Sequence, residues 1–277
     1  MTSHVDVDTL ARIIQSAAET EIMPRFRALG PDDIREKTSA IDLVTEADEA
    51  AERFIKAECA EHFAGALFVG EESVAADPAL LGKLGDADLA IVVDPIDGTA
   101  NFATGLPVFG VMAAVVSKGQ TVAGIIYDPL GRDFILAERG GGAFLDRKGE
   151  RSRLKLAAPA PLAEMIALGA PSLFPQAQRR EIFGSFAAFK TTANYRCAAY
   201  EYWSMAAGTA HLALFAKLMP WDHLPGVAIV EEAGAHVRRL DGSLYRPGHV
   251  DGGLLVAVDE ASWSLAHQTV FGSGPAR

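Results

Sequence analysis

Two carboxylates and a hydroxyl lie close together in the segment from Asp94 to Thr99, which reads Asp-Pro-Ile-Asp-Gly-Thr. The segment follows an apolar run at 89–93, which is typical of a strand buried on both faces of its sheet. Because Pro95 has no N–H and keeps Asp94 extended, the chain must leave this strand in a fixed direction. We therefore expect the acids just beyond the carboxyl end of the strand, where open α/β sheets bind their ligands.

Acidic residues also flank other predicted strands and helices. They are Glu71 and Glu72 after the apolar run 67–70, Asp222 before the apolar stretch 224–230, and Asp48 near the start of the helix predicted over 46–63. Asp48 stands three residues after Thr45, which is a capping-box spacing with Asp in the acidic position. A fold that brings the ends of these elements together would gather the acids.

Four of the acids are expected to share one pocket: Glu71, Asp94, Asp97 and Asp222. Like charges ~4 Å apart repel by about 4 kcal/mol per pair at an effective dielectric constant of about 20, so such a pocket needs cations. The ligands are all oxygens, and no paired His or Cys lies near them in the sequence. This donor set favours magnesium or manganese over zinc.

The same residues also have structural interpretations. Asp94 and Asp97 alone are compatible with an Asx turn, and Asp42 and Thr45 are compatible with a helix cap. Their neighbours are expected to serve the fold: Trp221 as a packing anchor, His223 on a helix surface, and Cys59 and Cys197 as small core residues. Only the acids taken as a set favour a metal site.

Four motifs follow one another along the chain: Asp42-Leu43-Val44-Thr45-Glu46-Ala47-Asp48, Gly70-Glu71-Glu72-Ser73, Asp94-Pro95-Ile96-Asp97-Gly98-Thr99-Ala100-Asn101-Phe102 and Trp221-Asp222. In order and approximate spacing they resemble the inositol monophosphatase family, part of the lithium-sensitive, magnesium-dependent phosphatase superfamily that includes fructose-1,6-bisphosphatase. The resemblance implies a metal-dependent phosphomonoesterase with an α/β fold, a layered α-β-α-β-α sandwich.

The resemblance also implies roles for the site residues. A first metal ion would be held by Glu71, Asp94 and the Ile96 carbonyl, and a second by Asp94, Asp97 and Asp222. Glu71 and Thr99 would orient and deprotonate the attacking water, and Asp48 would connect through water to a third, weaker metal. We therefore expect two or three Mg²⁺ ions as cofactor, Mn²⁺ as a substitute, and inhibition by lithium.

Three further residues are assigned near this site. Gly98 would let a substrate phosphate approach backbone amides at the start of a helix near Thr99. Lys37 matches a lysine that faces the metal site in the family, and Glu72 would support the metal ligands. For Lys37 and Glu72 the alternative is an exposed, solvated side chain.

The substrate wall departs from the family pattern. Arg196-Cys197-Ala198 replaces a Gly-Ser-Ala-like string, and Phe215 stands where inositol-processing relatives place a glutamate that binds ring hydroxyls. Losing that carboxylate should weaken a polyol substrate, because its hydroxyls would go unpaired. Arg196 instead offers charge to a second phosphate or a carboxylate, and Phe215 an apolar surface for a ring.

Alternative functions remain within and outside the family. Within the superfamily the alternative is a histidinol-phosphate or sugar (bis)phosphate phosphatase. A non-catalytic phosphoester-binding protein is opposed by the retention of Thr99 and the metal acids. Nucleic-acid binding is opposed by a net charge of −11 and a pI near 5.1, because phosphate backbones are held by clustered Lys and Arg.

The order of predicted elements supports an α/β chain of 277 residues. We expect a helix over 10–22, a polar loop at 31–41, an antiparallel meander over 108–138, and alternating helices and strands beyond 165. The polar stretch 146–153 suggests two lobes, 1–149 with most metal ligands and 150–277 with Asp222 and the substrate wall.

Cysteine usage and hydropathy bound the location. Two distant cysteines without a Cys-x-x-Cys pattern favour a reducing compartment. No basic, apolar leader and no apolar run near ~20 residues is present, so we expect a cytoplasmic protein without a membrane partner. The resemblance adds a homodimer that acts on a small phosphate ester.

Overall fold

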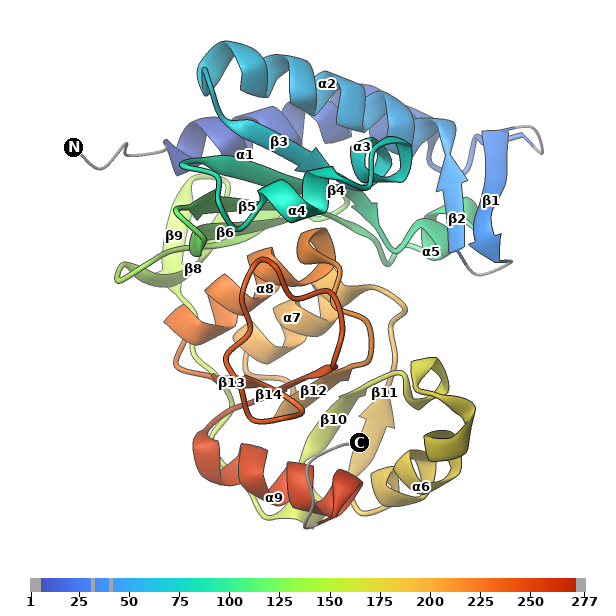
Figure 1. Cartoon of the computed structure of the whole chain (residues 1–277), viewed down its shortest axis with the longest axis vertical. Coiled ribbons are helices and arrows are strands. Elements are labelled where there is room, and N and C mark those ends of the chain that lie inside the picture. Colours follow the sequence, from blue (N-terminus) through green and yellow to red (C-terminus); the bar gives the residue numbers. More distant parts are fainter. Residues whose placement is uncertain (1–5, 31–32, 40–41, 273–277) are drawn as a thin grey trace.

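The structure, a computed structural model, describes residues 6–30, 33–39 and 42–272, with only the backbone of residues 37–39 and 42. Helices and sheets alternate in layers (Figure 1). The layers are α1 (Val7–Ala17) with α2 (Glu46–His62), a seven-stranded sheet, α7 (Ala198–Ala206) with α8 (Pro220–Glu232), a five-stranded sheet, and α6 (Gln176–Phe186) with α9 (Glu260–Phe271). This arrangement confirms the predicted α-β-α-β-α sandwich.

The seven-stranded sheet follows the chain in strand order. Its members are β3 (Leu67–Gly70), β4 (Ala90–Asp97), β5 (Gly110–Ser117), β6 (Gln120–Asp128), β7 (Asp133–Glu138), β8 (Gly142–Arg147) and β9 (Glu150–Arg153). Only β3 and β4 run parallel, and every later pair is antiparallel. The predicted meander is therefore confirmed by β5, β6 and β7.

Strand β4 is buried on both faces, as its apolar run predicts. Ile91 and Val93 pack into the core formed with α1 and α2. Ala90 and Val92 point to the other face and join a cluster that includes Trp221 of α8. Successive side chains of a strand alternate between faces, so a continuous apolar run fits a strand between two helical layers.

The five-stranded sheet has the order β11-β10-β12-β14-β13. Its strands are β10 (Ile166–Gly169), β11 (Thr191–Ala193), β12 (Leu212–Phe215), β13 (His236–Arg239) and β14 (Leu254–Ala257). Strand β9 pairs with β8 of the seven-stranded sheet, so the lobe boundary predicted between residues 149 and 150 would divide a β-hairpin. The predicted lobes 1–149 and 150–277 remain a proposal, and the pairing of β9 with β8 favours a junction after Arg153.

Short elements complete the described chain. They are the π-helical turn 18–22, the 3-10 turns 23–25, 162–164 and 171–173, α3 (Glu71–Ala76), α4 (Leu80–Lys83) and α5 (Thr99–Ala103). The loop expected over 31–41 is wrong in part, because Ile34–Ser39 forms β1 and pairs with β2 (Asp42–Thr45). Positions 31–32 and 40–41 lie outside the described residues. Within the described ranges, no helix combines the length and apolarity that crossing a bilayer requires.

Candidate active site

A β-bulge in β4 puts Asp94 and Asp97 on one face of the sheet. Residues three apart on a regular strand point to opposite faces. Here Asp94 pairs with Met112 and Asp97 with Gly110, so β4 holds one residue more than β5 between the two pairs. Pro95 fits this irregular stretch because it has no N–H to give to a ladder. Both acids therefore face the layer of α7 and α8.

The Asp97 carboxylate is anchored by the start of α7. Its Oδ2 accepts hydrogen bonds from the Ala199 N–H at 2.5 Å and from the Cys197 thiol at 3.0 Å. Gly110 permits this approach, since a Cβ there would lie 2.9 Å from Ala199 Cβ. Burial raises the pKa of Asp97, and these hydrogen bonds oppose the rise.

Asp94 is 2% exposed and lies among other acids. Its Oδ1 accepts a hydrogen bond from the Ile96 N–H at 3.0 Å, which is the Asx geometry expected for this sequence. Burial raises the pKa of Asp94 well above its usual range, and four carboxylates raise it further: Glu71, Asp97, Asp222 and Asp48. Glu71 lies beside it because the preceding Gly70 pairs with Val93.

This donor set fits a hard divalent cation by its chemistry. Grouped carboxylates whose charges raise one another's pKa are stabilised by a cation with oxygen ligands. Among the described side chains, no three His, Cys, Asp or Glu residues already surround one point as metal ligands do. The fit therefore rests on the electrostatic grouping around Asp94 and not on coordination distances.

Thr99 and Asp48 are connected directly. Thr99 Oγ1 lies 3.1 Å from Asp48 Oδ1 and 2.9 Å from the Ile96 carbonyl oxygen. The other Asp48 oxygen accepts the Thr45 N–H at 2.9 Å and the Thr45 hydroxyl at 2.5 Å. Thr45 in turn caps α2, so the predicted capping box is confirmed. The cap of α2 thus holds the partner of the Thr99 hydroxyl.

Gly98 is required by its conformation and by the space around it. Its φ is +90°, and an added Cβ would lie 2.9 Å from the Val108 carbonyl oxygen and 3.2 Å from Cys197 Cβ. The helix expected after it is only the five residues of α5. Asn101, which belongs to the third motif but was given no role from the sequence, fixes this region because its Nδ2 donates to the carbonyls of Val108 and Tyr195.

Glu52 is a second residue that sequence reasoning missed. This α2 carboxylate is 4% exposed and accepts the N–H groups of Glu72 and Ser73, each at 2.7 Å, and the Ser73 hydroxyl at 2.6 Å. Gly70 leaves room for it, since a Cβ there would lie 2.4 Å from the carboxyl carbon. Glu52 therefore caps α3, the short helix that begins with Glu71.

The predicted substrate wall is divided between surface and interior. Arg196 is exposed in a left-handed conformation, with φ 55°, and its N–H donates to Asn194 Oδ1 at 2.7 Å. Cys197 is buried as expected, and Ala198 is partly exposed at the start of α7. Phe215 is 8% exposed, so its ring offers little surface to a substrate.

The predicted position of His223 is wrong. It is 3% exposed, and its Nδ1 lies 2.9 Å from the Tyr202 hydroxyl oxygen. Burial lowers the pKa of His223 to about 4, so the ring is neutral at pH 7. Trp221 is a packing anchor, as expected, at 6% exposed. The side chain of Lys37 lies outside the described residues, and that of Glu72 is partly exposed.

Glu201 is a buried acid behind Asp97. It is 5% exposed, and its Oε1 accepts the Tyr195 N–H at 3.2 Å. Burial raises the pKa of Glu201 to about 8 from its ordinary 4.5; the Tyr195 bond opposes this and the charge of Asp97 adds to it. Between pH 4.5 and 8 the folded protein therefore holds a proton on Glu201 that the unfolded chain releases.

We expect Glu201→Gln to remove this pH dependence. Between pH 4.5 and 8 the native protein should lose stability as pH rises, because the folded state binds more protons than the unfolded state. Glutamine does not ionise and can still accept the Tyr195 N–H. At about 1.4 kcal/mol per pKa unit, the variant should gain a few kcal/mol over the native protein by pH 8.5.

Urea unfolding in EDTA at pH 5.5, 7.0 and 8.5 measures this difference in the free energy of unfolding. The gain of Glu201→Gln should be smallest at pH 5.5 and largest at pH 8.5. A stability difference that does not change with pH would show that Glu201 titrates normally.

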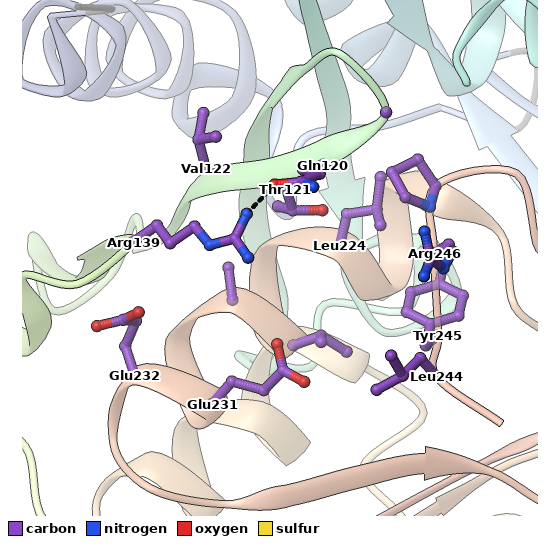
Figure 2. Close-up of a pocket in the computed structure, with 14 residues that line it drawn as sticks. Gln120, Thr121, Val122, Arg139, Leu224, Glu231, Glu232, Leu244, Tyr245 and Arg246 are labelled. Atoms are coloured by element: carbon purple, nitrogen blue, oxygen red, sulfur yellow. Dashed lines mark hydrogen bonds between the residues drawn. The ribbon is translucent and has the colours of Figure 1, made fainter. Parts of the chain in front are cut away.

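A cavity of about 280 Å³ lies elsewhere, against one side of α8 (Figure 2). Its lining combines Leu224, Val227 and Glu231 of α8 with Arg139 and the segment 244–247. The candidate acids are not among the described residues that line it. Its polar groups are largely engaged, since Glu232 accepts two backbone N–H groups and Arg139 bonds Gln120. We propose that the active site lies at the acids around Asp94.

Comparisons with known proteins agree with this fold. The sequence model of the inositol monophosphatase family matches residues 5–270. The inositol-1-monophosphatase of Mesorhizobium japonicum is 33% identical over 223 residues, which are 79% of each chain. The fructose-1,6-bisphosphatase/inositol-1-monophosphatase of Thermotoga maritima is 30% identical over 219 residues, 76% of this chain and 77% of the relative.

A solved structure gives the same result. The extragenic suppressor protein suhB from Bartonella henselae superimposes with a TM-score of 0.78 and 27% identity, covering 98% of both chains. The motif order, the sandwich and these matches confirm the resemblance stated from the sequence. The chain therefore belongs to the inositol monophosphatase family of phosphatases.

Proposed function

We propose that the chain is a Mg²⁺-dependent phosphomonoesterase that hydrolyses a small phosphorylated metabolite with a metal-activated water. The observation that carries the proposal is the buried Asp94 carboxylate, whose pKa is raised by burial and by four neighbouring acids. In a metal-free protein such a group is unfavourable, and a function that binds cations explains why it is kept.

Two or three cations are proposed, with Mn²⁺ as a substitute and lithium as an inhibitor. Glu71, Asp94 and the Ile96 carbonyl would hold one ion, and Asp94, Asp97 and Asp222 another. Bound Mg²⁺ would neutralise the phosphate, lower the pKa of water and stabilise the leaving oxygen. Its oxygen-only ligand set is the one that magnesium prefers.

The protein groups would orient and deprotonate the nucleophile. Glu71 is partly exposed and would accept the proton of the attacking water. The Thr99 hydroxyl is held by Asp48 and the Ile96 carbonyl, so its oxygen is fixed in place to orient that water. Asp97 is fixed by Ala199 and Cys197. Such prior positioning lowers the entropic cost of the reaction.

We propose that the substrate carries a second anionic group recognised by Arg196. The guanidinium of Arg196 makes no hydrogen bond or ion pair with any other described residue. Its left-handed backbone costs a non-glycine residue about 1 kcal/mol. Arg196 directly precedes Cys197, which packs against Gly98, and a contact of its exposed guanidinium with ligand would account for a cation at this position. Sugar bisphosphates and phosphate esters with a carboxylate have the required second charge.

The test is phosphate release from a panel of esters, with Mg²⁺ or with EDTA, by the native protein and by Arg196→Gly. The panel comprises fructose 1,6-bisphosphate, adenosine monophosphate, histidinol phosphate, inositol 1-phosphate and glycerol phosphate. We expect turnover only with Mg²⁺. Arg196→Gly should lower kcat/KM about tenfold for the bisphosphate, which corresponds to about 1.4 kcal/mol, and less than twofold for glycerol phosphate.

Glycine is the informative substitution because it relieves the backbone strain while removing the charge. A loss of activity cannot then be ascribed to a weakened fold. An equal loss on every ester, or a native preference for inositol 1-phosphate, would contradict the assignment of Arg196. Absence of Mg²⁺-dependent release from all five esters would contradict the proposed function.

A homodimer and a cytoplasmic location are also proposed. The homodimer rests on the family resemblance alone. The location is supported by Cys59 and Cys197, which are both free and buried. Free thiols are typical of reducing compartments.

A further inference from the structure

The first turn of α8 carries Asp222 and lacks one backbone hydrogen bond. Pro225 lies inside the helix. It has no N–H, so it cannot donate the bond that a helical residue at 225 would give to the Trp221 carbonyl. The direction of Asp222 therefore depends more on neighbouring side chains than it would in an uninterrupted helix.

His223, the next residue, makes a buried contact with α7. The Tyr202 hydroxyl oxygen lies 2.9 Å from His223 Nδ1, and the two residues are 0% and 3% exposed. The imidazole also bonds the backbone of Lys217. A neutral imidazole has one donor and one acceptor nitrogen, so a ring that donates to the Lys217 carbonyl accepts the Tyr202 O–H.

Close packing also ties Tyr202 to the next turn of α8. A Cβ at Gly226 would lie 2.1 Å from the Tyr202 ring, and a Cβ at Gly124 of β6 would lie 2.2 Å from the Pro225 carbonyl oxygen. The Tyr202 ring also stacks on Phe215, with centroids 5.0 Å apart and planes at 19°. Helices α7 and α8 lie side by side between the sheets (Figure 1). The helix is thus held between a strand and an aromatic ring.

We propose that the Tyr202–His223 hydrogen bond is a positioning contact that fixes the first turn of α8 and keeps the Asp222 carboxylate close to Asp94. Tyr202 and His223 act through Asp222 and touch neither substrate nor cation. The inference rests on the proposed function, because it uses Asp222 as a cation ligand.

The chain supplies a matched control in Tyr245. Its ring belongs to the same aromatic cluster, 6.4 Å from the His223 ring. Its hydroxyl is buried but has no hydrogen-bond partner among the described residues. Tyr202→Phe therefore removes a paired hydroxyl, and Tyr245→Phe removes an unpaired one, with the same loss of one oxygen atom.

The measurement is Mn²⁺ binding to the purified full-length protein, followed by the loss of the free Mn²⁺ signal in electron paramagnetic resonance. Tyr202→Phe should weaken Mn²⁺ binding about tenfold, and Tyr245→Phe should change it less than twofold. At saturating Mg²⁺ the KM for the ester of the panel that the native protein hydrolyses fastest should be unchanged in both variants. Thermal unfolding without metal gives the effect on the fold.

A double variant separates positioning from stability. Tyr202→Phe with His223→Leu removes both polar partners, so no buried nitrogen is left unpaired, and the metal-free melting temperature should recover toward the native value. Mn²⁺ binding should stay about tenfold weaker. Recovery of both properties would overturn the inference, because the contact would then serve stability alone.

Failure of the inference and failure of the proposed function can be told apart. Equal Mn²⁺ binding by the Tyr202→Phe and Tyr245→Phe variants, with a native protein that binds Mn²⁺, overturns the positioning role and leaves the phosphatase proposal intact. A native protein that does not bind Mn²⁺ contradicts the proposed function itself.

Discussion

Replacing Asp94 by asparagine is expected to reduce phosphatase turnover at least about a thousandfold while making the metal-free protein more stable. Asp94 is the acid assigned to both cation sites, and a thousandfold loss corresponds to about 4 kcal/mol of transition-state stabilisation. Asparagine keeps an oxygen that can accept the Ile96 N–H. It removes a charge that burial and four acids disfavour, which should raise the free energy of unfolding in EDTA.

Phosphate release with Mg²⁺ and urea unfolding in EDTA measure the two effects. Asp133→Asn is the matched control, because Asp133 is also buried but pairs with Arg147 at 2.8 Å. That variant should lose stability and keep its activity. Undiminished turnover by a folded Asp94→Asn variant would exclude Asp94 as a metal ligand, and a loss of stability in EDTA would contradict the electrostatic account.

The strand that carries Asp94 could be predicted because its cause is local. A continuous apolar run at 89–93 followed by Pro95 is sufficient for a buried strand that ends at an acid. The bulge that turns Asp97 to the same face could not be predicted, because it is defined by the pairing of Asp97 with Gly110 on the next strand. Register of this kind depends on two strands at once.

The burial of His223, which was predicted on a helix surface, is indicated by the residues that follow it in the sequence. Residues 224–230 are apolar around most of the helix, with Leu224, Val227, Ile229 and Val230 among them. A helix that is apolar on all sides is buried on all sides, so a histidine within it needs a hydrogen-bond partner. The identity of that partner, Tyr202, depends on how α7 packs against α8 and could not be read from the chain.

Glu52 could have been found in part. It stands four residues after Asp48 on the same helix, so the two side chains share a face. Because this face of the helix carries the site acid Asp48, the next acid on the same face could have been considered as a residue that supports the site. Its partners, the N–H groups of Glu72 and Ser73, lie about twenty residues away in a separate helix, and local pattern does not specify that contact.

Replacing Glu52 by alanine is expected to reduce both stability and activity. Gly70 at the cap of α3 has no side chain to accept a hydrogen bond, and Glu52 does so from α2. Its loss leaves two backbone N–H groups and the Ser73 hydroxyl without this acceptor, which should cost roughly 2–4 kcal/mol of the free energy of unfolding. Since Glu71 is the first residue of α3, its carboxylate should lose its fixed direction, and kcat should fall about a hundredfold.

Two further variants define what Glu52 contributes. Glu52→Gln keeps one acceptor oxygen for Ser73 and loses the acceptor of the Glu72 N–H, so its effects should be intermediate. Glu58→Ala removes a partly exposed carboxylate of the same helix, which lies 3.8 Å from His62 Nε2, and should change stability by less than about 1 kcal/mol. Urea unfolding gives the stabilities, and kcat at saturating Mg²⁺ gives the catalytic effect. Glu52→Ala could be destabilised and still keep the native kcat under conditions where it is folded. In that case the cap of α3 contributes only to stability, and other contacts orient the Glu71 carboxylate.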